Sequence, residues 1–292
     1  MNKIEFVAAC SDLGVIIDGS DISPIEILKD IDEKKLESVH IIKKENIEKE
    51  KESENKKRNL KYLNEFNYKL YNEISNIVNK NNIPLTVGGD HSVAIASALS
   101  SINKYKNLGI IWFDSHADYN TFDTTITGNI HGLPLAVITG YEKKLLSGFH
   151  KGNYYNPKKT VIVGARDIDP LEIKNLEDAG VTIFSTQDIR KFGVDNIVKK
   201  AFEIAYNQTN GIHISIDIDL LDPNIAPGVS VKAMNGINEN EFYSIIDIIL
   251  EKSNIVKSLD VVEFNPKMDK NNVTKNITLN IVNKIIEKYG GK

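Results

Sequence analysis

Short runs of β-branched and other apolar residues alternate with longer amphipathic segments along most of the chain, and this alternation restricts the fold most strongly. Several runs, such as LGIIWF and TVIVG, are apolar without alternating, which is typical of strands covered on both faces of a parallel sheet. The predicted strands are Ile4–Ala9, Pro84–Val87, Gly109–Phe113, Thr160–Val163, Val181–Phe184, Ile212–Asp217 and Val256–Val262. The predicted helices include Asn59–Asn79, Ser92–Lys104, Pro170–Ala179, Asn238–Lys252 and Lys275–Lys288. We therefore predict an α/β fold with a largely parallel sheet and helices on both faces.

Composition excludes several classes of protein. The 292 residues are 41% hydrophobic and 26% charged, which is ordinary for a globular chain and excludes fibrous and disordered classes. A net charge of −4 gives no electrostatic reason to expect a nucleic-acid or anionic-membrane partner. The single cysteine, Cys10, excludes an intrachain disulfide and any multi-cysteine metal site. Because we find neither a signal-peptide pattern nor an apolar run of about 20 residues, we expect a soluble, cytoplasmic protein without a membrane partner.

One segment departs from this pattern. Residues Lys43–Arg58, KKENIEKEKESENKKR, are nearly all charged and of mixed sign. Mixed signs weaken the net field, so we expect a solvated helix or surface loop here and not a nucleic-acid patch or a partner-binding arm. Internal repeats and Pro- or Ser-rich linkers are absent from the sequence. We expect one domain over residues 1–292, with a charged surface segment near 43–58.

Acidic residues and histidines follow the predicted strands directly, which is where α/β proteins place their ligands. Each cluster alone has a structural interpretation: a surface loop, a turn cap, or a glycine turn with a helix N-cap. Together, however, all of them lie at strand carboxyl ends and are expected to meet in one crevice. The side chains are His91 in GGDHS, Asp114, His116 and Asp118 in DSHAD, Asp217 and Asp219 in DID, and Glu263 after SLDVV.

Spacing and charge point to a metal centre. In an extended chain, residues i, i+2 and i+4 project to one face, so the DSHAD and DID side chains project together. Four carboxylates crowded at a buried edge cannot all stay ionised without a cation. Two histidines and four aspartates form a hard ligand set that suits Mn²⁺ better than structural Zn²⁺. Six ligands exceed what one open catalytic ion needs but suffice for two ions that share carboxylates, and two such ions activate a bridging water.

The segments GGDHS, DSHAD and SIDIDLLDP, in this order, resemble the signature of the ureohydrolases, the family of arginase, agmatinase and formiminoglutamase. The resemblance extends from about Gly14 to the C-terminus. It implies a three-layer α/β/α sandwich around a mostly parallel sheet, and a dinuclear manganese enzyme that hydrolyses guanidino or related groups. It also implies the ligands of the two ions: His91, Asp114, Asp118 and Asp217 for one, and Asp114, His116, Asp217 and Asp219 for the other, with Asp114 and Asp217 bridging. The expected cofactor is two Mn²⁺ per chain, with Co²⁺, Fe²⁺ or Ni²⁺ as alternatives.

The loop after Asp118 resembles arginases more closely than agmatinases, whose loop is shorter. This resemblance implies that Asn120, Thr127 and Asn129 contact a substrate α-carboxylate. The segment VGARDIDP implies that Asp169 binds the α-ammonium. For the chemistry it implies that His131 is the proton shuttle, that Glu263 faces the guanidinium, and that Asp118 belongs with them among the catalytic side chains. In APGVSVKA, Val231 and Lys232 replace the Thr-Pro usual in the family.

The activity implied is hydrolysis of L-arginine to L-ornithine and urea by a hydroxide that bridges two manganese ions, as part of arginine metabolism. Two alternatives stay open. One is another ureohydrolase substrate, agmatine or formiminoglutamate; the other is a non-catalytic binding protein with the same fold, against which the presence of all six ligand positions argues. The partners expected are a small guanidino substrate and, from the resemblance, further copies of the chain in a trimer or hexamer.

Overall fold

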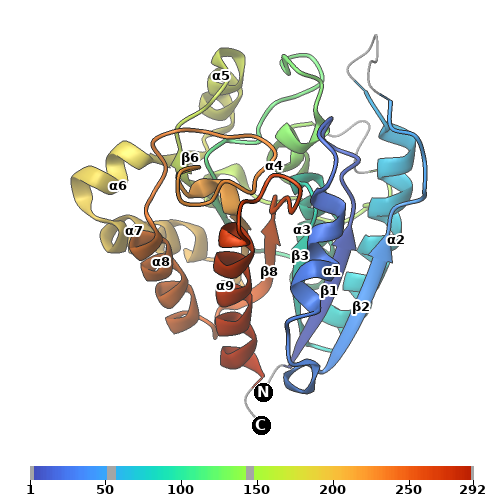
Figure 1. The fold of residues 1–292 in the computed structure, drawn as a ribbon. Coiled ribbons are helices and arrows are strands. Elements are labelled where there is room, and N and C mark those ends of the chain that lie inside the picture. The colour runs from blue at the N-terminus through green and yellow to red at the C-terminus, as the bar shows by residue number, and fades with distance from the viewer. Residues whose placement is uncertain (1–2, 51–56, 143–147, 291–292) are drawn as a thin grey trace.

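The computed structural model describes residues 3–50, 57–142 and 148–290. Its centre is one eight-stranded sheet in the order β2-β1-β3-β8-β7-β4-β5-β6, and every neighbouring pair is parallel (Figure 1). The strands are β1 (Ile4–Cys10), β2 (Ser38–Lys43), β3 (Ile83–Gly88), β4 (Gly109–Phe113), β5 (Thr160–Ala165), β6 (Thr182–Ser185), β7 (Ile212–Asp217) and β8 (Val256–Val262).

Helices cover both faces of the sheet. The α-helices are α1 (Ser23–Leu28), α2 (Leu60–Asn79), α3 (Ala94–Tyr105), α4 (Pro134–Ile138), α5 (Pro170–Ala179), α6 (Thr186–Phe192), α7 (Val194–Tyr206), α8 (Glu239–Glu251) and α9 (Val273–Tyr289). Short 3-10 turns include η3 (His91–Val93), η4 (Ile130–Gly132) and η6 (Ile218–Leu220). One apolar core lies between the sheet and α1, α7, α8 and α9, and a second lies between the sheet and α2, α3 and α4 (Figure 1). The chain is thus a three-layer sandwich.

The predicted fold class is confirmed, and all seven predicted strands are present with small shifts at their ends. The pattern missed β2, an edge strand whose residues are half-buried or exposed and therefore lack the apolar run of a central strand. It also did not name α1, α4, α6 or α7. No helix within the described residues is both long and apolar enough to span a bilayer.

The sheet order explains why distant motifs meet. Strands β3, β8, β7 and β4 are consecutive in the sheet, so the four loops at their carboxyl ends are neighbours although they are far apart in sequence. The loop after β3 passes very close to the loop after β1, since a Cβ on Gly89 would lie 1.9 Å from the carbonyl oxygen of Ser11. Only glycine permits this approach, which brings the GGDHS segment into place.

Residues 43–50 of the charged segment are exposed or half-buried, and two of their lysines bind one buried carboxylate. Residues 44–50 form no regular secondary structure, and residues 51–56 lie outside the described residues. The ammonium groups of Lys44 and Lys49 both bind the buried carboxylate of Asp12, and Lys49 also binds Asp18 at 2.7 Å. The sequence pattern could not reveal these contacts, because the acidic partners lie more than thirty residues earlier.

Candidate active site

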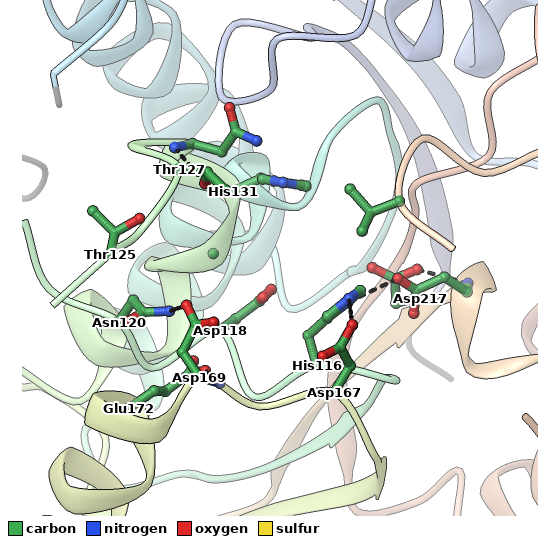
Figure 2. Close-up of a pocket in the computed structure, with 14 residues that line it drawn as sticks. His116, Asp118, Asn120, Thr125, Thr127, His131, Asp167, Asp169, Glu172 and Asp217 are labelled. Atoms are coloured by element: carbon green, nitrogen blue, oxygen red, sulfur yellow. Dashed lines mark hydrogen bonds and ion pairs between the residues drawn. The ribbon is translucent and has the colours of Figure 1, made fainter. Parts of the chain in front are cut away.

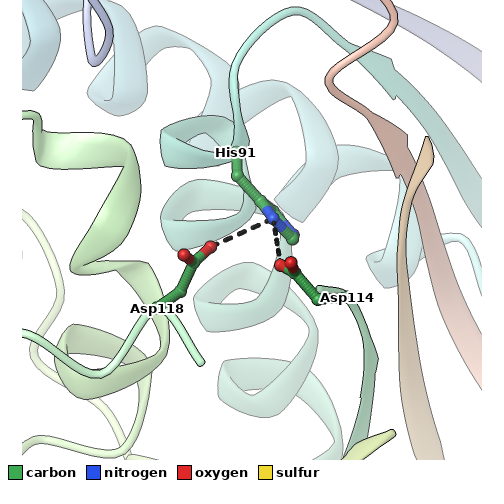
Figure 3. A group of neighbouring side chains, drawn as sticks. All are labelled: His91, Asp114 and Asp118. Carbon is green, nitrogen blue, oxygen red and sulfur yellow. Dashed lines mark ion pairs between the residues drawn. The ribbon is translucent and has the colours of Figure 1, made fainter. Parts of the chain in front are cut away.

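The first group of ligands surrounds one imidazole nitrogen. His91 Nδ1 lies 3.1 Å from one carboxylate oxygen each of Asp114, Asp118 and Asp217. Figure 3 shows the first two carboxylates converging on the ring. These side chains come from the loops after β3 and β4 and from the last residue of β7, and all are buried. The structure therefore brings four of the six predicted ligands together at one point.

The geometry of His91 fits a metal ligand. Its Nδ1 atom is buried and forms no hydrogen bond despite three carboxylates around it. The other ring nitrogen, Nε2, lies 2.9 Å from Ser215 Oγ, and the ring stacks on Trp112 with 3.9 Å between centroids. A histidine whose far nitrogen is held in this way presents its free nitrogen in a fixed direction, as metal-binding histidines do. With three carboxylates opposite, the donor set suits an oxygen-preferring divalent cation.

A second group lies beside the first and shares Asp114 with it. His116 Nδ1 is 3.0 Å from Asp219 Oδ2 and 3.5 Å from Asp114 Oδ1. Asp114 thus directs Oδ2 to the His91 group and Oδ1 to the His116 group, as a bridging ligand requires. Asp217 directs Oδ2 to His91, while its Oδ1 accepts the Asp219 N–H at 2.7 Å. Asp114 thus lies near both histidines, whereas Asp217 lies near His91 alone.

Crowding of the carboxylates shifts their pKa values in opposite directions. Burial, together with the charge of Asp114, raises the pKa of Asp118 to about 6. Burial and the neighbouring Asp219 and Asp114 raise the pKa of Asp217 well above its ordinary value. Although burial opposes it, hydrogen bonding to His116 and His91 lowers the pKa of Asp114. This cluster holds some carboxylates neutral in the absence of a cation, which is the electrostatic instability that divalent ions would relieve.

The two groups open onto a cavity of about 180 Å³ (Figure 2). Most of the residues that line it are polar or charged: apart from Gly132, Val231 is the one non-polar residue among the described lining residues. The remaining lining residues are His116, Asp118, Asn120, Thr125, Thr127, Asn129, His131, Asp167, Asp169, Glu172, Asp217 and Asp219. The four substrate-binding candidates therefore line the same cavity as four of the six metal-ligand candidates, while His91 and Asp114 lie outside its lining.

One wall pairs an amide with two carboxyl groups. Asn120 Nδ2 donates to Asp169 Oδ2 at 3.0 Å (Figure 2), and Asn120 Oδ1 accepts from Thr124 Oγ1. Glu172 lies behind them, accepting the Tyr119 N–H at 2.6 Å and the Asp169 N–H at 3.2 Å. Burial raises the pKa of Glu172 to about 8. Asp169, preceding Pro170 at the start of α5, is thus fixed at a helix N-terminus with its carboxylate toward the cavity.

His131 and Glu263 form a pair on another side. His131 Nδ1 lies 2.9 Å from Glu263 Oε1, which also accepts the His91 N–H at 2.7 Å. Although burial opposes it, the charge of Glu263 raises the pKa of His131. Glu263 Oε2 is buried without a hydrogen-bond partner, and Glu263 is not among the residues that line the cavity. Its backbone has φ of +67°, a strained conformation for this residue type that is typical of functional positions.

Sequence reasoning missed four contributors to the site. Thr125, Asp167 and Glu172 line the cavity although no role was expected for them. Their positions flank the expected residues Thr127 and Asp169, so proximity in sequence was the available signal. Arg58, in the charged segment, donates to the Thr127 carbonyl at 2.8 Å and also to Asn129 Oδ1. That contact spans about seventy residues, and no local pattern could indicate it.

Comparison with known proteins shows the family of the chain. The Arginase family model matches residues 4–287. The chain is 34% identical over 238 residues to the arginase of Staphylococcus aureus strain COL, covering 81% of this chain and 78% of that protein. It is 31% identical over 300 residues to the arginase of Bacillus caldovelox, covering 96% of each. These matches extend over the strands and loops that carry the candidate ligands.

Solved structures show the same architecture. The native structure of Bacillus caldovelox arginase at pH 5.6 superposes with a TM-score of 0.91 at 29% identity, covering 100% of this chain and 99% of that one. Entamoeba histolytica arginase in complex with L-ornithine superposes with a TM-score of 0.89 at 26% identity, covering 98% of both chains. The sequence match, the sheet order and the paired His–Asp groups agree, and the chain belongs to the arginase family.

Proposed function

We propose that this chain hydrolyses L-arginine to L-ornithine and urea. The observation that carries the proposal is the junction of two overlapping His–Asp groups with a cavity whose other walls are amide, hydroxyl and carboxyl side chains. The His–Asp groups fit divalent cations. The polar side chains of the cavity walls fit a small molecule with two polar groups, such as an α-amino acid. The named arginases to which the chain is similar support the same choice of substrate.

Two divalent ions, Mn²⁺ in our proposal, would be held by the residues of the two groups. His91, Asp118 and Asp114 would form one site, with Asp217 beside them, and His116, Asp219 and Asp114 the other. The chemistry that bound ions supply is activation of the attacking water at neutral pH. We propose both Asp114 and Asp217 as bridging ligands; in this structure the Oδ1 atom of each accepts a backbone N–H of its own turn, from His116 and Asp219 respectively.

The cavity residues would orient the substrate. Donors on Thr127 and Asn129 suit the α-carboxylate, and Asp169 supplies an anion for the α-ammonium. One of the two amide hydrogens of Asn120 binds Asp169. The other is proposed to be donated to the substrate α-carboxylate. Holding the amino-acid end in this way leaves the guanidinium directed at the His–Asp groups, so the reacting carbon is positioned before water attacks.

A proton must reach the departing amine of ornithine. His131 lines the cavity, and because its Nδ1 faces Glu263, Nε2 is the atom left to exchange a proton with the substrate. Glu263 favours the charged form of this ring and so stores the proton to be delivered. Glu263 Oε2 accepts no hydrogen bond from a described residue, but it is buried outside the cavity lining. We therefore propose that Glu263 acts on the substrate through His131, and its direct contact with the guanidinium stays a prediction.

The broader assignments are proposals of the same kind. One sheet and its two apolar cores extend over the described residues, which supports a single domain over 1–292. We propose a cytoplasmic homo-oligomer, a trimer or hexamer, that acts on a small guanidino molecule and has no nucleic-acid or membrane partner. Size-exclusion chromatography with light scattering tests the oligomeric state.

The deciding experiment compares substrates after loading with Mn²⁺. Urea release is measured from L-arginine and from agmatine, and formamide release from formiminoglutamate. We expect kcat/KM to be largest for L-arginine by orders of magnitude, because a site built for polar groups is left with unpaired atoms when the substrate lacks them. A larger value for agmatine or formiminoglutamate contradicts the substrate assignment, and no turnover of any of the three supports a binding protein.

A further inference from the structure

Arg58 connects the charged segment to the substrate side of the cavity. Its Nη2 atom donates to the carbonyl oxygen of Thr127 at 2.8 Å and to the side-chain oxygen of Asn129. Both of these residues line the cavity, and Arg58 itself does not. The guanidinium therefore lies behind the wall that would face the substrate carboxylate.

The backbone that carries Arg58 is itself fixed. The next residue, Asn59, is 3% exposed and adopts a left-handed conformation, with φ of +55°, at the start of α2. Asn59 Nδ2 donates to the Leu13 carbonyl at 3.1 Å, and Asn59 and Glu50 exchange two backbone-to-side-chain hydrogen bonds. Arg58 thus projects from an anchored turn, and its position is set by contacts on the other side of the segment.

This contact decides which atoms of the wall are free to donate. Because the guanidinium occupies Asn129 Oδ1, the amide cannot rotate to present oxygen to the cavity without losing a charge-assisted hydrogen bond. Asn129 Nδ2 forms no hydrogen bond with any other described residue. Thr127 Oγ1 accepts the Asn129 N–H at 3.2 Å, so its hydroxyl proton is also free to be donated. Both side chains are set as donors, which is the polarity that a carboxylate needs.

We propose that Arg58 is a positioning and specificity-determining residue for the substrate α-carboxylate. It holds the Asn129 amide with its NH2 group available, keeps the Thr127 backbone in place, and adds a positive charge behind both. This inference rests on the proposed function, since it assigns a role in recognising the amino-acid end of L-arginine. It also gives the C-terminal residue of the charged segment a function: Arg58 supports the wall of the pocket from behind.

The test uses substrates and ligands with and without the carboxylate. Arg58→Met removes charge and donors, and Arg58→Lys keeps the charge but loses the planar fork. We expect Arg58→Met to raise KM for L-arginine by about tenfold to a hundredfold, the effect of losing one charged hydrogen bond, while kcat changes by less than about threefold. KM for agmatine should stay within about twofold, and Arg58→Lys should be intermediate. Calorimetric Kd values should follow the same pattern, rising for L-ornithine and unchanged for putrescine.

A matched control and a double-mutant cycle separate positioning from a general structural role. Lys69→Met removes one positive charge that binds Glu45 of the same segment at 3.1 Å, away from the cavity. This control should change neither the ratio of KM for L-arginine to KM for agmatine nor the ratio of Kd for L-ornithine to Kd for putrescine. Arg58→Met combined with Asn129→Ala should cost little more than Asn129→Ala alone, because Arg58 acts through that amide. Three results would each overturn the inference. They are an equal loss of affinity in Arg58→Met for L-arginine and agmatine or for L-ornithine and putrescine, fully additive effects of Arg58→Met and Asn129→Ala, and an unchanged Kd for L-ornithine. Failure of the wild-type protein to turn over L-arginine refutes the proposed function instead, and the calorimetric comparison still decides the role of Arg58.

Discussion

The metal-ligand end and the substrate end of the cavity are built in different ways. At the metal-ligand end, carboxylates follow strands directly and are held by N–H groups of the same turns: His116 N–H binds Asp114 Oδ1 at 2.7 Å, and Asp219 N–H binds Asp217 Oδ1 at 2.7 Å. At the substrate end, residues 117–129 form no helix or strand. Side chains from distant segments hold this loop, through the pairs Asn120–Asp169 and Arg58–Asn129.

This difference separates activity from selectivity. Strand ends in a packed sheet resist displacement. A substitution at the metal-ligand end should therefore change the turnover of every substrate by the same factor. The substrate end depends on a few polar contacts, each replaceable without disturbing the sheet, and should determine which molecule is accepted. The two candidate ligand histidines also differ: the side chain of His91 is 1% exposed and does not line the cavity, and that of His116 is 22% exposed and does.

The largest expected effect is at the shared ligand. Asp114→Asn should lower kcat for L-arginine and agmatine alike by roughly a thousandfold or more, because several kcal/mol of transition-state stabilisation depend on both ions. Metal content should fall below two ions per chain by elemental analysis. Asp118→Asn is the matched comparison and should cost less, since Asp118 belongs to the His91 group alone. Equal losses in the two variants would contradict a bridging role for Asp114.

The next effect should appear at the substrate end only. Asp169→Ala should lower kcat/KM for L-arginine by about tenfold to a hundredfold through loss of one charged contact to the α-ammonium, with metal content unchanged. Asp188→Ala is the control, because Asp188 is an aspartate in the first turn of α6 that accepts the Ser185 N–H at 2.8 Å and does not line the cavity. Loss of bound metal in the Asp169 variant would show that the two ends are not independent.

Metal removal should destabilise the protein and sharpen the comparison. Binding to the folded state alone adds about 2.7 kcal/mol at a hundredfold excess over Kd, or roughly 4–5 °C in Tm for a chain of this size. Hydrogen exchange should quicken around residues 114–118 after chelation, and less so around residues 120–129. An unchanged Tm between stripped and Mn²⁺-loaded protein would refute the metal site.

The smallest effect concerns Glu172, whose pKa burial raises from 4.5 to about 8. A raised folded-state pKa contributes stability that is complete below about pH 4.5 and is lost as the pH rises through about 8. Glu172→Gln cannot ionise, so its Tm relative to wild type should rise by a few degrees between pH 6 and pH 9 in metal-free protein. The bond it loses to the Asp169 N–H lowers Tm equally at every pH. A difference independent of pH would show that Glu172 is already ionised at pH 6.

Much of the fold and of the metal-ligand end was predictable, for one physical reason. A central parallel strand is buried on both faces, so its sequence is an apolar run, and the residues directly after it are confined to the edge of the sheet. His91, Asp114, Asp118 and Asp217 follow such runs, and they converge within hydrogen-bond distance. Strand β2 was missed because an edge strand buries less of its surface and loses this signal.

The sequence by itself therefore determined the fold class, the approximate strand ends and the set of candidate ligand side chains, because these depend on local periodicity and on chain-adjacent spacing. Tertiary structure alone decided the rest. It placed Arg58 behind Asn129, Lys49 against Asp12, and Glu263 behind His131 outside the cavity wall. Each of these contacts joins segments at least thirty residues apart, and each depends on how the loops pack over the sheet. Such polar contacts between surface loops leave no period in the sequence, so only the folded chain reveals them.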